Sequence, residues 1–194
     1  MNNRQISDLS RQQWIKYKQK NHSKLLNQYP DYDHTARLRV MIDFKTVLKE
    51  EGVTLFLANG VLLGAYREGN FIAWDDDVDM DVLAEEIIPK QDAVREKLVE
   101  LGYIVRVVRE HPHGKMNIYH AREKVGIVYL YLDGPIRYRQ AWKWPKDLYE
   151  NREKITFKGV EFCTPSIEKY LIHQYGEDWN TPKIEDYFSE DLYR

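Results

Sequence analysis

Five aspartates stand within seven consecutive positions of the stretch FIAWDDDVDMDV, residues 71–82. Carboxylates crowded in this way repel one another and lose hydration on burial, so another interaction should offset that cost. The second half of the stretch alternates apolar and acidic residues, which is typical of a β-strand with one face in the core. Its acidic members all fall on the opposite face: Asp77, Asp79 and Asp81.

Asp77 and Asp79 have the Asp-apolar-Asp spacing of a divalent metal site on a strand. Residues two apart on one strand face lie about 7 Å apart at Cα, so the two carboxylates can converge on one or two ions. Carboxylate ligands suit Mg²⁺ or Mn²⁺, and two such ions about 4 Å apart stabilise the attacking and leaving oxygens of a phosphoryl displacement. The spacing therefore favours metal-assisted phosphoryl transfer, with Asp81 as a spare carboxylate on the same face.

Two other interpretations of the acidic stretch involve no catalysis. One is a solvated acidic turn, and it stays open. The other is an EF-hand calcium loop, because Asp75, Asp77 and Asp79 are spaced D-x-D-x-D. Glu86 takes the twelfth position of such a loop, but the sixth must be glycine and is Met80 here, so the EF-hand is excluded.

The stretch LFLANGVLLGAYREGNF, directly upstream, reads as a strand, a glycine, a short apolar helix and a second glycine. Glycine lets the backbone approach a ligand closely, and a helix that starts there points free N–H groups at an anion. Arg67 adds a guanidinium whose donors suit phosphate. Gly60, Gly64 and Arg67 are therefore candidate phosphate-binding residues; the alternative for each glycine is tight packing of the helix against the strand.

Apolar residues that recur at helical spacing predict helices over residues 35–52, 60–67, 89–101 and 167–175, with Thr35 and Ser166 as N-caps. Strands are predicted over residues 53–58, 78–82, 103–109, 116–121 and 125–132, with a turn at Glu123-Lys124. A hairpin over residues 155–162 turns at Lys158-Gly159. This order favours a mixed α/β fold whose sheet is covered mainly on one side.

Length and composition predict one domain over residues 35–194, preceded by a helical or loosely ordered arm, residues 1–34. The formal net charge of −2 gives no field that would attract DNA or an anionic membrane. Cys163 is the only cysteine, which excludes an intramolecular disulfide and a cysteine zinc cluster. The sequence shows no signal-peptide core and no apolar run of membrane-spanning length, so the expected location is the cytoplasm, with membrane association only through a partner or acceptor.

The stretch NGVLLGAYREGNFIAWDDDVDMDV resembles the signature of the LicD family, whose members carry a stretch close to GTLLGAxRxGxFIPWDDDIDI. That family is similar to the nucleotidyltransferase superfamily and to fukutin-type enzymes. A second patch of likeness carries the resemblance across residues 35–182, at Gly159, Pro165, Leu171, Tyr175-Gly176, Trp179 and Pro182. The resemblance implies a nucleotidyltransferase-like fold, a mixed β-sheet flanked by helices.

The resemblance also implies an enzyme that moves a phospho-alcohol, such as phosphocholine, from a CDP-linked donor to a hydroxyl group of a glycan, and releases CMP. Fukutin-like relatives use CDP-ribitol in the same way. Asp77 and Asp79 would ligate Mg²⁺ or Mn²⁺, and the donor phosphate would be held by Gly60 and Arg67. Asp75 and Asp76 would support the loop or the metal water shell, while Trp74 is expected to pack beneath the acidic strand.

The chain departs from the family pattern after the hairpin, where IVYLYLDGP has tyrosines in place of an acidic residue. Asp133 is the carboxylate near this position. It is a candidate for the third carboxylate, or for the base that removes the acceptor proton, or it only begins the turn with Gly134-Pro135. Val61 and Ala73 replace a threonine and a proline of the signature, and the loss of the threonine hydroxyl could remove a phosphate contact.

Basic residues further along the chain are candidates for binding donor phosphate or an anionic glycan, although exposed basic residues are usually only solvated. They are Lys115, Arg137, Arg139 and Lys143. The leading hypothesis is a metal-dependent phospho-alcohol transferase acting on a cell-surface or capsule glycan precursor. The alternatives are a nucleotidyltransferase that moves a nucleoside monophosphate to a small molecule or RNA, and a catalytically silent relative that binds a nucleotide or glycan.

Overall fold

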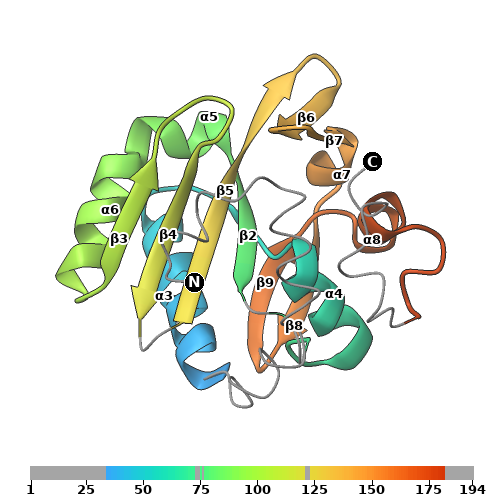
Figure 1. Cartoon of the computed structure of the whole chain (residues 1–194), viewed down its shortest axis with the longest axis horizontal. Helices are drawn as coiled ribbons and strands as arrows, with labels where there is room; N and C mark the ends of the chain where they lie inside the picture. Colours follow the sequence, from blue (N-terminus) through green and yellow to red (C-terminus); the bar gives the residue numbers. More distant parts are fainter. Residues whose placement is uncertain (1–33, 73–74, 76, 121–122, 182–194) are drawn as a thin grey trace, which may run out of the picture. The chain divides into compact units, whose positions relative to one another are not determined.

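The computed structural model describes residues 34–72, 75, 77–120 and 123–181 (Figure 1). Residues 33–176 make up one compact unit, and the described residues 177–181 fall outside it. The predicted boundary between an arm over residues 1–34 and a domain over residues 35–194 stays a prediction, because residues 1–33 and 182–194 lie outside the described part. None of the helices in that part is long and apolar enough to cross a membrane.

Helices and strands of the unit alternate along the first half of the chain, and strands dominate the second half. The helical segments are α3 (His34–Glu50), α4 (Asn59–Glu68), α5 (Ala84–Ile87), a 3₁₀ turn (Ile88–Lys90), α6 (Gln91–Glu100), α7 (Asp147–Glu150) and α8 (Ile167–Tyr175). The strands are β1 (Leu55–Phe56), β2 (Val78–Leu83), β3 (Ile104–Val108), β4 (Lys115–His120), β5 (Glu123–Asp133), β6 (Ile136–Arg139), β7 (Trp142–Pro145), β8 (Glu153–Phe157) and β9 (Val160–Thr164).

The strands form a mixed sheet in the order β3-β4-β5-β2-β1-β9-β8 (Figure 1). β2 and β5 run parallel at its centre, and β1 is parallel to β9. The other neighbours are antiparallel, and the last residues of β5 leave this sheet to pair with β6, which pairs with β7. Because β2 and β5 are central neighbours, a residue of one strand lies directly beside a residue of the other on the same face.

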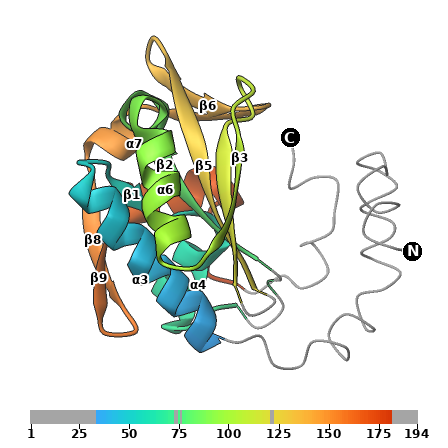
Figure 2. The same ribbon diagram turned by 90° about the vertical axis from the view of Figure 1, so that its left-hand side faces the viewer.

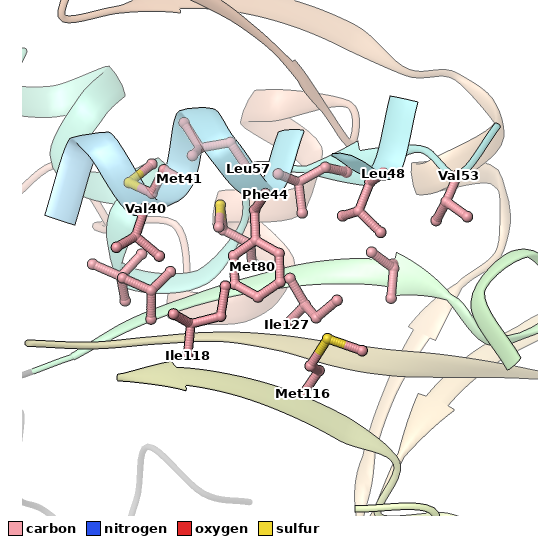
Figure 3. Packing of buried hydrophobic residues seen from close by; sticks show 14 of the residues in the cluster. Val40, Met41, Phe44, Leu48, Val53, Leu57, Met80, Met116, Ile118 and Ile127 are labelled. Atoms are coloured by element: carbon pink, nitrogen blue, oxygen red, sulfur yellow. The ribbon is translucent and has the colours of Figure 1, made fainter. Parts of the chain in front are cut away.

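The hydrophobic core lies between α3 and the sheet. α3 and α6 lie on the same side of the sheet (Figure 2). Val40, Phe44 and Leu48 of α3 point at the strands, where they meet side chains of β2, β4 and β5 (Figure 3). The apolar members of the β2 alternation are in this cluster: Val78, Met80 and Val82. Their burial confirms the predicted alternation of β2 and directs its acidic residues to the other face.

The predicted helix starts and turns were confirmed in part. Gly52 and the pair Lys158-Gly159 have positive φ at the predicted helix end and hairpin turn. Thr35 is not an N-cap, because α3 already begins at His34. Ser166 precedes α8, but the first free backbone N–H, that of Ile167, donates to the Glu153 carboxylate instead.

The predicted turn at Glu123-Lys124 is wrong. Both residues belong to β5, where Glu123 pairs with His120 of β4. Each has a charged partner that holds it in the strand: Arg37 binds Glu123, and Lys124 donates to Asp77. Strand propensity alone would not place two charged residues at the start of a central strand, so the partners account for the difference.

Candidate active site

The paired central strands bring the predicted metal ligands beside a lysine. Asp79 of β2 pairs with Gly126 of β5, so both lie on the face away from α3. Lys124 lies two residues before Gly126 on the same face, and its Nζ donates to Asp77 Oδ2 at 3.0 Å. Asp77 and Lys124 expose 37% and 36% of their side chains. The site is therefore a pair of carboxylates with one fixed positive charge, open on one side to solvent.

Asp79 carries a charge that the fold does not fully stabilise. Its side chain is partly buried, and within the described part of the chain no group donates a hydrogen bond to its carboxylate. Burial and the Asp77 charge raise the pKa of Asp79, and Lys124 and Arg139 offset the rise only in part. A partly buried carboxylate without a donor is electrostatically suited to bind a cation.

Gly126 makes room for the Asp79 carboxylate. A Cβ atom at Gly126 would lie 2.5 Å from Asp79 Oδ1, closer than real contacts allow. Glycine in the interior of a strand weakens it, and such a glycine marks a place where another group approaches closely. Any side chain at this position would displace the carboxylate, so Gly126 is part of the site.

The alternation predicts Asp81 as a spare carboxylate beside Asp77 and Asp79, but in the structure it is occupied by other partners. It is fully buried, and its oxygens accept hydrogen bonds from the Tyr149 hydroxyl at 2.6 Å and the Asn59 amide at 3.2 Å. A guanidinium nitrogen of Arg139 lies 3.6 Å away. Burial raises the pKa of Asp81, and Arg139, Tyr149 and Asn59 oppose the rise. Asp81 therefore connects β2 to the elements that carry Tyr149, Asn59 and Arg139.

Asn59, the first residue of α4, is fixed by the same network. Its amide also donates to the backbone oxygen of Asp79 at 3.2 Å, and its side-chain oxygen accepts from Arg139 at 2.9 Å. Its backbone N–H donates to the Tyr170 hydroxyl. The φ angle of Asn59 is +55°, a left-handed conformation that asparagine tolerates better than most residues. The start of α4 is thereby tied to the backbone of the acidic strand.

Gly60 lies beside the carboxylate of Asp75. A Cβ atom at Gly60 would collide with Asp75 Oδ2, and Asp75 is 7% exposed. The N-terminal end of a helix carries partial positive charge, which favours a carboxylate there. The sequence predicts that a ligand phosphate closely approaches Gly60, but in the structure the group that approaches Gly60 is the Asp75 carboxylate.

Gly64 and Arg67 lie away from the start of α4. A Cβ atom at Gly64 would lie 2.5 Å from the backbone oxygen of Asn70, which corresponds to the packing alternative. Arg67 is in the last turn and donates to Glu68. At about 1.5 Å per residue, its Cα lies about 10 Å along the axis from Gly60.

Asp133 is not near the carboxylate pair. It is the exposed last residue of β5, where it pairs with Ile136 across a turn that contains Gly134 in a left-handed conformation. At about 3.3 Å per residue, it lies about 23 Å along the strand from Gly126. The structure places Asp133 as the turn alternative predicts, and does not bring it to Asp77 and Asp79.

The face of β5 beside the two aspartates carries no acidic side chain. Lys124, Gly126 and Val128 point to this face, since Gly126 pairs with Asp79 and side chains alternate. Lys115 of β4, a predicted phosphate-binding residue, pairs with Val128 and so lies on the same face. Among the residues that the structure describes, no three His, Cys, Asp or Glu side chains converge as metal ligands. The predicted site residues Trp74 and Asp76 lie outside them.

Arg37 was not among the predicted site residues. Arg37 of α3 is fully buried, binds Glu123 at the start of β5, and donates to the backbone oxygen of Asp75 at 2.9 Å. It thereby connects the two chain segments that lead into the site. A basic residue on the apolar side of the helical pattern HTARLRVMIDF was the available signal, since arginine is rarely fully buried without a partner.

Comparison with known proteins places this site in a family context. The model of the family described as LicD/FKTN/FKRP, nucleotidyltransferase domain, matches residues 52–166, which include the acidic strand and its neighbours. The uncharacterized protein RP689 of Rickettsia prowazekii (strain Madrid E) is 27% identical over 147 residues, 73% of this chain and 54% of that protein.

Ribitol 5-phosphate transferase FKRP is similar at the same level. The mouse and human proteins are 26% and 25% identical over 145 residues, which are 67% of this chain and 29% of each relative. This chain thus spans about half of the rickettsial protein and less than a third of FKRP.

A solved structure shares the fold. The solution structure of the antibiotic-resistance factor ANT(2'')-Ia is similar with a TM-score of 0.52 and 15% sequence identity, over 78% of this chain and 77% of that one. Its crystal structure in complex with adenylyl-2''-tobramycin gives a TM-score of 0.48 over 76% of this chain and 79% of that one, also at 15% identity. The predicted nucleotidyltransferase-like fold, a mixed sheet flanked by helices, is confirmed.

Proposed function

Because the chain belongs to the LicD/FKTN/FKRP nucleotidyltransferase family, we propose that it transfers a phospho-alcohol from a CDP-linked donor to a hydroxyl group of a glycan and releases CMP. The name of FKRP supports ribitol phosphate as the group transferred. Phosphocholine is the alternative that the LicD resemblance offers. The observation that carries the proposal is the Asp79 carboxylate, partly buried beside Asp77 and without a hydrogen-bond donor in the described part of the chain.

The residues present fit a divalent cation. Asp77 and Asp79 supply oxygen ligands of the kind that Mg²⁺ and Mn²⁺ prefer, and Gly126 leaves space for the Asp79 carboxylate. A bound cation would remove the repulsion between the two carboxylates and would draw negative charge from the phosphate that is transferred. We therefore assign Asp77 and Asp79 as the residues that hold the metal.

Two basic side chains next to the carboxylates suit the phosphates of the donor. Lys124 is held beside Asp77, and its charge and that of Arg139 both act on Asp79. Burial lowers the pKa of Lys124, but the Asp77 and Asp79 charges outweigh it and raise that pKa, so the lysine stays protonated at neutral pH. A fixed ammonium and a guanidinium at this edge of the site orient an anionic donor before the acceptor enters.

The proposed transfer forms one bond to phosphorus and breaks one, and it needs no further reactant besides the donor and the acceptor. The acceptor hydroxyl oxygen forms a bond to the phosphorus that bears the alcohol, and the bond from that phosphorus to the oxygen bridging to CMP breaks. CMP leaves with the bridging oxygen, and the proton of the acceptor hydroxyl passes to bulk water. The positive charges of Lys124 and Arg139 stabilise the negative charge on the phosphates during this step.

A binding screen on the full chain tests the proposal. We expect CDP-ribitol or CDP-choline with Mn²⁺ to raise the melting temperature, because a ligand at 100 times its Kd stabilises by about 2.7 kcal/mol. Asp79→Asn should abolish the shift, and CMP should appear when a glycan acceptor is added. Pyrophosphate release from a nucleoside triphosphate would instead favour the nucleotidyltransferase alternative. Nucleotide binding without turnover of any donor would favour the silent relative.

A further inference from the structure

Asn117 reaches the metal-binding face from the strand beyond β5. It lies in β4 and pairs with Gly126, which pairs with Asp79, so the three residues form one row across the sheet. Asn117 is only 6% exposed. The place of a Cβ atom on Gly126 lies 3.0 Å from Asn117 Oδ1 and 2.5 Å from Asp79 Oδ1. The amide oxygen and the carboxylate oxygen therefore converge over the glycine.

The side chain of Asn117 has no hydrogen-bond partner among the residues that the structure describes. Asn117 is largely buried and its amide has no partner among these residues, so the amide oxygen is available to a ligand at this face. Gly126 does not adopt a left-handed φ, so backbone conformation does not explain the glycine. Its small size explains it, because any side chain would push both oxygens apart.

A third oxygen ligand is what the carboxylate pair lacks. Lys124, Gly126 and Val128 occupy the face of β5 where a neighbouring carboxylate would be expected. We propose that Asn117 supplies the third protein oxygen of the divalent cation site formed with Asp77 and Asp79. Amide oxygens are accepted ligands for Mg²⁺ and Mn²⁺, and a neutral ligand suits a site where Lys124 already contributes positive charge. This inference rests on the proposed function, because it adds a ligand to the same site.

The amide has a second possible orientation, with its NH₂ group donating to the Asp79 carboxylate. The two orientations predict opposite effects of an added negative charge. If the oxygen faces the cation, Asn117→Asp adds a stronger ligand and tightens Mn²⁺ binding. If the NH₂ group faces Asp79, the new carboxylate removes a donor from Asp79 without replacing it, and the variant binds Mn²⁺ no more tightly than the parent.

Mn²⁺ titration of the full chain, followed by electron paramagnetic resonance and calorimetry, tests the proposal. We expect Asn117→Leu to weaken Mn²⁺ binding at least 10-fold, since even residues that only orient a ligand change affinity by about 10–100-fold. Asn117→Asp should bind Mn²⁺ more tightly, melt lower than the parent in EDTA and recover stability in Mn²⁺. Asn151→Asp adds the same charge at an exposed position and should leave Mn²⁺ affinity unchanged.

The outcomes separate the two proposals. If the parent binds Mn²⁺ and Asp79→Asn abolishes that binding, while the Asn117 variants match the parent, Asn117 is not a ligand and the proposed function stands. Weaker binding by Asn117→Asp would also overturn the inference. If the parent binds no Mn²⁺ at all, both proposals fail. Should Asn117→Leu not fold, the Asn117→Asp comparison in EDTA and Mn²⁺ decides the question.

Discussion

At the scale of single residues, Asp79 is partly buried, and no group among the described residues donates a hydrogen bond to its carboxylate. Lys124 sits beside Asp77, not beside Asp79, and Asp81 has its own partners in the interior. The fold is therefore less stable with Asp79 ionised than with it neutral, which the raised pKa of Asp79 expresses. Sites that bind ligands commonly contain such a cost to stability.

Replacing Asp79 by asparagine should stabilise the metal-free protein at neutral pH. A carboxyl group with a raised pKa in the folded state contributes stability below its unfolded pKa, and that contribution is lost as pH rises through the folded value. An asparagine side chain cannot ionise, so in EDTA we expect Asp79→Asn to have a higher free energy of unfolding than the parent above that pH. For a chain of this size each kcal/mol corresponds to roughly 2–4 °C in Tm.

Thermal melts in EDTA across the acid to neutral range check this prediction. The difference between Asp79→Asn and the parent should disappear at low pH, where the parent carboxyl is protonated. In Mn²⁺ the order should reverse, because only the parent gains stability from the ion. A variant that melts below the parent at neutral pH in EDTA would show that Asp79 is stabilised within the fold.

At the scale of elements, α4 is positioned by hydrogen bonds at its first residue. Asn59 contacts β2 through Asp79 and Asp81, and Arg139 and Tyr149 bring β6 and α7 to the same point. Tyr149 belongs to an element of only four residues, yet it is buried and donates to the fully buried Asp81. The spacing between α4 and the acidic strand thus depends on contacts from distant parts of the sequence.

Tyr149→Phe should destabilise the fold by about 1.5–3 kcal/mol, because the change removes a hydrogen bond to a buried carboxylate. Urea unfolding followed by circular dichroism measures the change. Tyr66→Phe is the matched control, since the Tyr66 hydroxyl donates to Glu168 at an exposed position and its loss should cost less than about 0.5 kcal/mol. Equal losses in the two variants would mean that the Asp81 network does not hold the elements together.

At the scale of the whole molecule, the central features of the fold follow from local patterns. The alternation of β2 sorts Val78 and Met80 into the core and Asp79 to the other face, and the glycines with positive φ stop helices and turn hairpins where predicted. These predictions succeed because strand alternation and glycine turns are determined by a residue and its neighbours in sequence.

Other features depend on contacts that the sequence does not display. Lys124 looks like a turn residue until its partner Asp77 is known. Asp81 looks like a spare carboxylate until its hydrogen bond with the buried Tyr149 is known. Nothing in the sequence around Asn117 marks it as a site residue, because its position beside Asp79 depends on how β4, β5 and β2 pair. The distance of Asp133 from the site could not be predicted either, because it depends on the length of β5, whose last residue is Asp133.

The parallel pairing of β2 with β5 also determines when the site forms during folding. Residues 84–122 separate the two strands, so a long loop must close before Asp79 meets Gly126. Closing a loop costs entropy, and pairings between distant segments slow folding. We expect the proposed metal site to be completed only after the rate-limiting step.

Mn²⁺ should consequently slow unfolding and leave the refolding rate nearly unchanged, because it stabilises only interactions formed after the transition state. Stopped-flow measurements in urea, with Mn²⁺ and with EDTA, give both rates. Asp79→Asn should show the same two rates in either solution. Faster refolding of the parent in Mn²⁺ would place the β2–β5 pairing in the folding nucleus. On the kinetics expected here, the metal lengthens the lifetime of the folded chain without guiding the chain to its fold.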